Sequence, residues 1–307
     1  MNGTNAVLFV SFGGPDKRED VRPFLESVTR GRGIPPERIE EVARHYEAIG
    51  GASPINAITN RQAEGLREQL NGTPVYVGNR NWHPFLEVTL REMAAAGIKQ
   101  AVGFPTAAYR CEASWERYLQ AVEAARKKVG PSAPAVTYVG PWFDHPLFID
   151  AIVARIREAH APANASWIFT AHSIPTPMAE ASRYVQELEA TAGLVCARFG
   201  VQTWTLAYTS RSGAPADPWL GPDVRDEIRA QARQGVNDML AVPIGFVADH
   251  VEVLFDLDVE AQEAAREAGV AFRRARTVGD HPLFIRMIAD VVKNPVPSPA
   301  RGEGRRP

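Results

Sequence analysis

A histidine that follows an apolar segment is the first candidate for chemistry in this sequence. His172 comes shortly after Trp167–Phe169, within Thr-Ala-His-Ser-Ile-Pro. A histidine at the carboxyl end of a parallel strand lies where such folds place reactive groups, and a neutral imidazole accepts a proton or binds a metal ion. The alternative is a histidine that only hydrogen-bonds within its own loop. Position alone leaves both interpretations open, so His172 is a candidate catalytic base and metal ligand.

Three carboxylates form the second candidate group. Glu252, Asp256 and Glu260 are spaced four residues apart in Gly245–Glu260, which begins at a predicted strand end and continues as a predicted helix, so they share one helical face. Like charges at this spacing repel, whereas carboxylate oxygens are suitable ligands for a hard divalent cation. The alternative is a solvated face with basic neighbours. Glu252 stands apart because it lies in the first predicted turn, beside the strand end.

These residue types suit proton transfer and metal coordination. A histidine and a glutamate that face each other across a cleft would be a sufficient pair, because either group can take a proton or hold a metal ion. Hydrolases and isomerases use the same residue types, so the pair alone does not identify a reaction. Two polar residues of the same turn, Asp249 and His250, are expected to orient neighbouring groups and not to react.

An internal repeat shows how the chain positions these groups. Asp144–Ile149 and Asp280–Ile285 both read Asp-His-Pro-Leu-Phe-Ile, and a helix-like apolar pattern follows each. Short β-branched runs alternate with amphipathic stretches, which indicates an α/β fold with parallel sheets. We expect two doubly wound lobes, each with a four-stranded parallel sheet, and a ligand cleft at the carboxyl ends of the strands. The expected divisions are lobes over residues 1–143 and 144–279, a helix over 280–293 that packs back on the first lobe, and a disordered tail over 294–307.

Composition excludes several classes of protein. The 307 residues include 34 basic and 36 acidic ones, which gives a net charge of −2 and none of the basic surplus of a nucleic-acid-binding protein. The two cysteines, Cys111 and Cys196, lack metal-ligand spacing and exclude a disulfide framework. The N-terminus lacks the pattern of a signal peptide, and no apolar run approaches the roughly 20 residues of a membrane span. A cytoplasmic protein without stable membrane insertion is expected.

Six segments of the chain match a known family. The sequence resembles the ferrochelatases, lyases that insert Fe²⁺ into a porphyrin, from Ser11 to about Val292. The matching segments are Ser11–Pro15, Tyr46–Pro54, Gly78–Pro84, Ala171–Pro175, Pro218–Val224 and Gly245–Asp258.

The resemblance implies a fold and a set of site residues. It implies two flavodoxin-like lobes of the chelatase type that hold the porphyrin between them. His172 and Glu252 would bind the metal and handle the pyrrole protons, and Asp256 and Glu260 would form a path for metal delivery. Fe²⁺ enters this reaction as a substrate.

The resemblance is strongest to the coproporphyrin-dependent bacterial branch, whose product is Fe-coproporphyrin III (coproheme). Arg30-Gly31-Arg32, Ser53 and Tyr118 carry it. Coproporphyrin has four propionates, and guanidinium groups pair bidentately with carboxylates. The expected porphyrin-binding residues are Ser53, Tyr118, Arg30, Arg44, His45 and Phe12. The alternatives are ordinary surface for Arg30 and Arg32, and core packing for Tyr118.

Three departures from the family pattern are visible. Phe12 stands where part of this branch has a tyrosine, so it cannot ligate iron from the face opposite His172. Some relatives hold a [2Fe–2S] cluster through clustered cysteines near the C-terminus; this chain has none there, so no cluster is expected. The loop Thr106–Ser114 differs from the serine-rich loop of the family, and its residues Arg110 and Glu112 could alter porphyrin contacts.

Other functions compete with this hypothesis. The nearest are a protoporphyrin IX ferrochelatase and a cobalt chelatase, and the presence of Glu252 in place of a second histidine favours iron over cobalt. A non-catalytic tetrapyrrole or metal carrier of the same fold is the alternative outside catalysis. Retention of both His172 and Glu252 speaks against a carrier, which needs no proton acceptor. A downstream haem-pathway enzyme is an expected partner.

Overall fold

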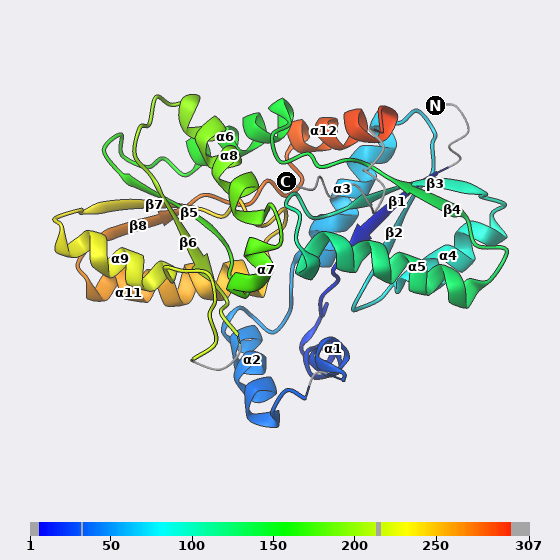
Figure 1. Ribbon diagram of the computed structural model, residues 1–307, viewed down its shortest axis with the longest axis horizontal. Helices are drawn as coiled ribbons and strands as arrows, with labels where there is room; N and C mark the ends of the chain where they lie inside the picture. Colours follow the sequence, from blue (N-terminus) through cyan, green and yellow to red (C-terminus); the bar gives the residue numbers. More distant parts are fainter. Residues whose placement is uncertain (1–5, 32, 213–215, 296–307) are drawn as a thin grey trace.

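The fold contains two four-stranded parallel sheets, which confirms the α/β class. The computed structural model describes residues 6–31, 33–212 and 216–295. The first sheet has the order β2-β1-β3-β4 and the second the order β6-β5-β7-β8 (Figure 1). The strands are β1 Ala6–Ser11, β2 Val75–Asn79, β3 Gln100–Pro105, β4 Ala135–Tyr138, β5 Ser166–His172, β6 Thr205–Thr209, β7 Asp238–Val242 and β8 Ala271–Arg274.

Helices connect and cover the strands of each sheet. In the first half they are α1 Arg18–Thr29, α2 Pro36–Ala48, α3 Ile55–Gln69, α4 Leu86–Ala95, the π-helical turn η1 Glu112–Glu116, and α5 Arg117–Val129. In the second half they are α6 Pro146–Glu158, α7 Thr176–Glu180, α8 Tyr184–Ala197, α9 Val224–Arg233, α10 Val251–Phe255, the π-helical segment η2 Asp256–Ala261, α11 Gln262–Glu267 and α12 Pro282–Lys293. We call each sheet with its covering helices a lobe.

The first lobe shows why buried parallel strands are apolar along their whole length. Every residue of β1 is buried, because alternate side chains enter two different cores. Val7 and Phe9 pack on the side of α3, and Leu8 and Val10 pack on the side of α4 and α5. The second lobe repeats the arrangement around β5, with α6 and α8 on one side and α9 and α11 on the other (Figure 1).

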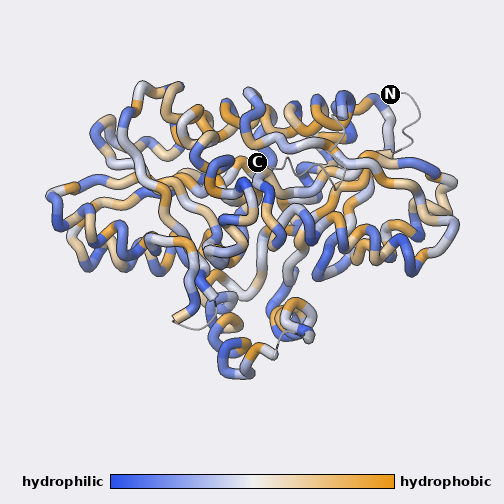
Figure 2. The backbone as a smooth tube through the Cα atoms, in the orientation of Figure 1, coloured by the Kyte–Doolittle hydropathy of each residue, from blue (hydrophilic) through white to orange (hydrophobic). Residues whose placement is uncertain are grey.

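Hydropathy follows this layering. Figure 2 shows hydrophobic residues concentrated along the strands and on the inward sides of the helices. Figure 1 shows α1 and α2 projecting from the two lobes. Their apolar residues Phe24 and Tyr46 pack with Val251 at the start of α10, so this projection contacts the second lobe.

The repeated Asp-His-Pro-Leu-Phe-Ile sequence begins α6 and α12. In each copy the histidine ring caps the helix: Nδ1 of His145 accepts from the Leu147 amide, and Nδ1 of His281 accepts from the Leu283 amide, both at 3.2 Å. The prolines occupy the first helical positions, which need no backbone donor. The repeat is therefore a capping motif, and α12 packs against both α3 and α6.

Two structural findings bear on the remaining expectations. Within the described residues, none of the helices combines the length and the apolar character needed to cross a membrane. The tail expected to be disordered falls outside the described residues from position 296 onward, and Arg32 is also outside them.

Candidate active site

A cleft lies at the carboxyl ends of the strands, between the two lobes. Its volume is about 690 Å³, and its lining includes Ser11 at the end of β1, His172 at the end of β5 and Thr209 at the end of β6. Open parallel sheets place their ligands outside these strand ends. The two parallel sheets therefore present two such edges to one space.

His172 presents one nitrogen to the cleft. Its Nδ1 lies within hydrogen-bond range of the Ser173 carbonyl oxygen. Because a carbonyl only accepts, Nδ1 carries a proton, and in the neutral form of the ring Nε2 is then the lone-pair donor. The Tyr184 hydroxyl donates to the His172 carbonyl at 3.0 Å. Hydrogen bonds therefore fix the position of both the backbone and the side chain of His172.

Glu252 lies next to His172 in the same lobe. The Oε2 atom of Glu252 is 3.7 Å from Nε2 of His172, and each side chain is 34% exposed. The expectation that the two groups face each other across a cleft is wrong: β5 and α10 place both on the second-lobe wall. The distance exceeds a direct hydrogen bond, so two lone-pair donors stand side by side, as two ligands of one cation would.

Gly245 permits this juxtaposition. The turn after β7 passes so close to β5 that a Cβ atom at Gly245 would lie 2.6 Å from the Ala171 Cα. The Gly245 amide donates to the Thr170 carbonyl at 3.0 Å. Only glycine fits this approach, and the approach carries the chain from β7 past His172 to Glu252.

The charge of Glu252 is set by two histidines. Burial opposes its ionisation, but His172 and His250 in their protonated forms outweigh burial and lower the Glu252 pKa to about 2. The ring of His250 lies 3.4 Å from Glu252 Oε2 and 3.1 Å from the Ala248 carbonyl. Burial lowers the His250 pKa, but Glu252 more than compensates, so the net direction is upward. Glu252 is thus a carboxylate at neutral pH.

Asp256 and Glu260 continue from Glu252 along the cleft, although not on one regular α-helix. Residues 256–261 are π-helical, and all three carboxylates line the cleft. Burial is the main cause that raises the Asp256 pKa to about 7, and Ser210 Oγ bonds to its Oδ2. Burial also raises the Glu260 pKa, against the opposing effect of Arg225, whose Nη1 is 3.2 Å from Glu260.

Comparison with known proteins matches this geometry to a family. The ferrochelatase family model matches residues 4–296. A coproporphyrin III ferrochelatase from Mycobacterium avium is 45% identical, with 94% of this chain and 87% of the relative covered, and one from Nocardia farcinica is 44% identical over the same shares. The chain belongs to the ferrochelatase family.

Solved structures agree with this ferrochelatase at the level of the fold. SirB from Bacillus subtilis, in a structure with Fe³⁺, has a TM-score of 0.62 at 12% identity and covers 95% of each chain. At this identity the likeness concerns the fold alone. It supports the chelatase-type pair of lobes that the family resemblance implied.

Some of the residues expected to contact the porphyrin line the cleft of this ferrochelatase, and others do not. Phe12, Ser53, Tyr118 and His45 line the cleft, and the His45 ring stacks on Phe255 with 3.8 Å between centroids. Tyr118 is buried, and burial raises its pKa. By contrast, the two arginines predicted to bind the porphyrin are exposed and outside the cleft lining: Arg30 and Arg44.

Other arginines line the cleft in their place. Arg80 directly follows β2, with its guanidinium 5.6 Å from the Phe12 ring centroid, and Arg117 begins α5 beside Tyr118. Arg80 and Arg211 could have been predicted as cleft residues from the sequence, because each closely follows a predicted strand. The arginines of the lining are Arg38, Arg80, Arg117, Arg211 and Arg225.

Arg110 points to the other lobe and is not part of the cleft lining. Its backbone amide and Nε donate to Glu187 on α8 at 2.8 and 2.6 Å. The Glu187 side chain is 1% exposed and that of Arg110 is 27% exposed. Arg110 belongs to the loop before η1, which lines the cleft. The ion pair with Glu187 therefore fixes this loop to the second lobe. Glu112, in contrast, is exposed and 4.0 Å from Arg117.

Arg110→Leu is expected to destabilise the protein by about 3 kcal/mol, since removal of one partner leaves a buried charge uncompensated. Urea unfolding measures this change. Arg266→Leu is the matched control, because Arg266 is 71% exposed and pairs with Glu263, which is also exposed, and its expected cost is below about 1 kcal/mol. Equal costs for both variants would contradict a buried interlobe pair.

Proposed function

We propose that this ferrochelatase inserts Fe²⁺ into coproporphyrin III to give coproheme in haem biosynthesis. The observation that carries the reaction is the His172–Glu252 pair, with two lone-pair donors 3.7 Å apart at the wall of the cleft. Insertion requires the removal of two pyrrole protons and temporary coordination of the metal. One neutral imidazole and one ionised carboxylate supply both capacities.

The residues have separate roles in this proposal. Nε2 of His172 is free to accept a pyrrole proton, because Nδ1 is committed to the Ser173 carbonyl. Glu252, ionised next to His250, supplies the oxygen ligand for the incoming Fe²⁺. Asp256 and Glu260 lie further along the same cleft and are suited to deliver the cation. Carboxylate oxygens are suitable ligands for a hard divalent cation.

The choice of coproporphyrin III has two supports. The relatives from Mycobacterium avium and Nocardia farcinica carry this substrate in their names. The arginines of the cleft lining supply cationic partners for propionates, and coproporphyrin has four propionates where protoporphyrin IX has two. Each buried propionate requires a partner of opposite charge. We therefore assign porphyrin recognition to Arg38, Arg80 and Arg117, together with Ser53, Tyr118, His45 and Phe12.

The proposed enzyme works in the cytoplasm without an iron–sulfur cluster. Four thiolates hold such a cluster in most proteins, and the chain has only two cysteines, Cys111 and Cys196. A downstream haem-pathway enzyme would then receive the coproheme.

Anaerobic turnover tests the function. Purified protein, Fe²⁺ and either coproporphyrin III or protoporphyrin IX are mixed, and loss of porphyrin fluorescence is followed over many equivalents. We expect multiple turnovers with coproporphyrin and a kcat/KM at least about tenfold lower with protoporphyrin, the factor that corresponds to about 1.4 kcal/mol of lost propionate binding. Faster turnover with protoporphyrin would overturn the substrate. A spectral change that stops at one equivalent with both would favour a carrier.

A further inference from the structure

The turn that carries the chain from β7 to Glu252 is held from behind by the first lobe. We call residues 243–250 the catalytic turn. Its Val247 carbonyl accepts two hydrogen bonds: from the Gly279 amide at 3.0 Å, and from Nε2 of Gln62 at 3.3 Å. Gln62 belongs to α3 of the first lobe, whereas the catalytic turn belongs to the second. One carbonyl therefore joins a catalytic segment to the opposite lobe.

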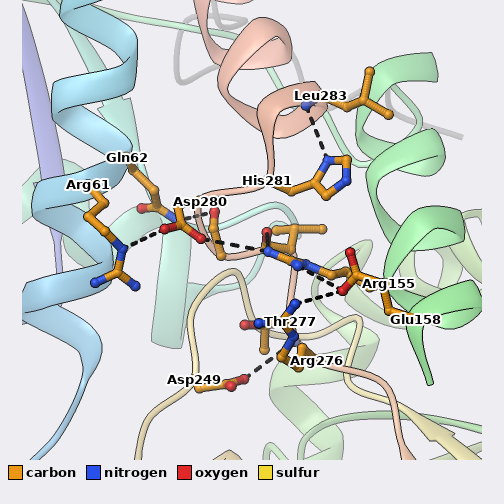
Figure 3. Close-up of polar contacts among 12 residues, drawn as sticks. Arg61, Gln62, Arg155, Glu158, Asp249, Arg276, Thr277, Asp280, His281 and Leu283 are labelled. Carbon is orange, nitrogen blue, oxygen red and sulfur yellow. Dashed lines mark hydrogen bonds and ion pairs between the residues drawn. The ribbon is translucent and has the colours of Figure 1, made fainter.

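Gln62 also holds the linker that precedes α12. The same Nε2 atom donates to the Gly279 carbonyl at 2.9 Å (Figure 3). Gln62 is fully buried, so water does not compete for these carbonyls. A second contact supports the turn nearby: Asp249 Oδ1 lies 3.4 Å from the Thr277 amide. The linker thus contacts the catalytic turn at Val247 and at Asp249, and Gln62 ties both segments to α3.

The lobes do not depend on Gln62 to stay together. Helix α12 packs against α3 and α6, and its Ile285 and Ile288 belong to the main apolar core. An ion pair joins Arg61 of α3 to Asp280 at 2.5 Å (Figure 3). These contacts bind the linker and α12 to the first lobe without touching a carbonyl of the catalytic turn. The additional role of Gln62 is to fix the position of that turn.

The opposite side of the catalytic turn faces the cleft. Val247 and Ala248 line the cleft, and Ala248 packs with Ile55 and Ile58 of α3. The Ala248 carbonyl lies 3.1 Å from Nδ1 of His250, whose other nitrogen contacts Glu252. A shift of Val247 therefore moves the residues that hold Glu252. We propose that Gln62 is a positioning residue that fixes the catalytic turn, and through it Glu252 on the second-lobe wall, relative to the first lobe.

This inference rests on the proposed function, and kinetics of Gln62→Met test it. The variant keeps the side-chain volume but removes the donor, so the Gly279 carbonyl loses its only side-chain partner among the described residues. We expect kcat to fall about tenfold, because misplacement of a reacting group by a fraction of an ångström has effects of this order. The Kd for coproporphyrin in the absence of iron, from fluorescence titration, should change less than about threefold, because the cleft walls remain.

Two further variants separate positioning from general stability. Arg61→Met, one residue away, breaks the exposed ion pair to Asp280 and should keep kcat within about twofold of the wild-type value. Gln62→Asn keeps a buried amide, one methylene further from the two carbonyls. If Gln62→Met fails to fold, Gln62→Asn is the variant to measure. Its kcat should lie between those of the wild-type protein and Gln62→Met.

Three results of these kinetic and binding measurements would overturn the inference. The first is an unchanged kcat in both Gln62 variants. The second is a coproporphyrin Kd that rises by the same factor by which kcat/KM falls. The third is a loss of kcat in Arg61→Met equal to that in Gln62→Met. If the wild-type protein shows no turnover, the proposed function fails, and hydrogen exchange still reports on Gln62. In that measurement, amides of residues 243–250 should exchange faster in Gln62→Met while those of β5 stay protected; unchanged exchange of the turn would also overturn the inference.

Discussion

Replacement of His172 by alanine is expected to lower kcat by about 10²- to 10⁴-fold, the usual contribution of a positioned acid or base. Nε2 of His172 is the nitrogen that faces Glu252 at 3.7 Å, and alanine removes both a proton acceptor and a metal ligand there. Porphyrin binding should survive, because the cleft is lined by residues from many elements of both lobes. Anaerobic iron insertion measures the first quantity, and quenching of porphyrin fluorescence without iron measures the second.

His160→Asn is the matched control for this prediction. His160 is exposed and has a φ of 48°, a left-handed conformation that asparagine tolerates better than alanine. Its kcat should equal that of the wild-type protein. Normal turnover in His172→Ala would remove His172 from the mechanism, and loss of porphyrin binding in that variant would make its role structural.

The parts of the fold that sequence alone could predict are those governed by local pattern. Apolar β-branched runs such as Val7–Val10 require burial on both faces, which parallel sheets provide. The repeated Asp-His-Pro-Leu-Phe-Ile marked the starts of α6 and α12, since a capping histidine and a proline act within one helical turn. His172 was found for the same reason: its place after a strand fixes which edge of the sheet it occupies.

The relations between distant segments could not be read in this way. Nothing local to Arg110 shows that it reaches Glu187, 77 residues away, and nothing local to Gln62 shows that it meets Val247, 185 residues away. The placement of His172 and Glu252 on one wall depends on how the β7–α10 turn passes β5. Sequence reasoning selected Arg30 and Arg44 to bind the porphyrin and missed the arginines that line the cleft. A sequence shows which residues are charged but not which way their side chains point.

Asp256→Asn is expected to stabilise the protein at pH 8. The Asp256 pKa rises from 3.8 to about 7, mainly because of burial. The folded state thus binds this proton more tightly than the unfolded state, so stability from this group falls as the pH rises from about 4 to about 7 and stays low above that. Each pKa unit corresponds to about 1.4 kcal/mol, so the gain in the free energy of unfolding is at most a few kcal/mol.

Urea unfolding at two pH values measures this gain. Asp256→Asn should be more stable than the wild-type protein at pH 8, with a smaller gain at pH 5, because the wild-type carboxyl is then largely protonated in the folded state. Asp226→Asn is the control, since Asp226 is 75% exposed on α9 and its change should stay within about 0.5 kcal/mol. A gain that is equal at the two pH values would contradict the raised pKa of Asp256.

Retention of a destabilising carboxylate at the cleft suggests a functional benefit, because surplus stability is easily gained by substitution and is lost mainly where activity requires it. Asp256→Asn should therefore raise the KM for Fe²⁺ more than it lowers kcat, since an amide keeps the shape of the side chain but is a weaker ligand for a hard cation. The KM for coproporphyrin should not change. If the variant gained stability while its KM for Fe²⁺ stayed at the wild-type value, metal delivery would not pass through Asp256, and the carboxylate series beyond Glu252 would lose its proposed role.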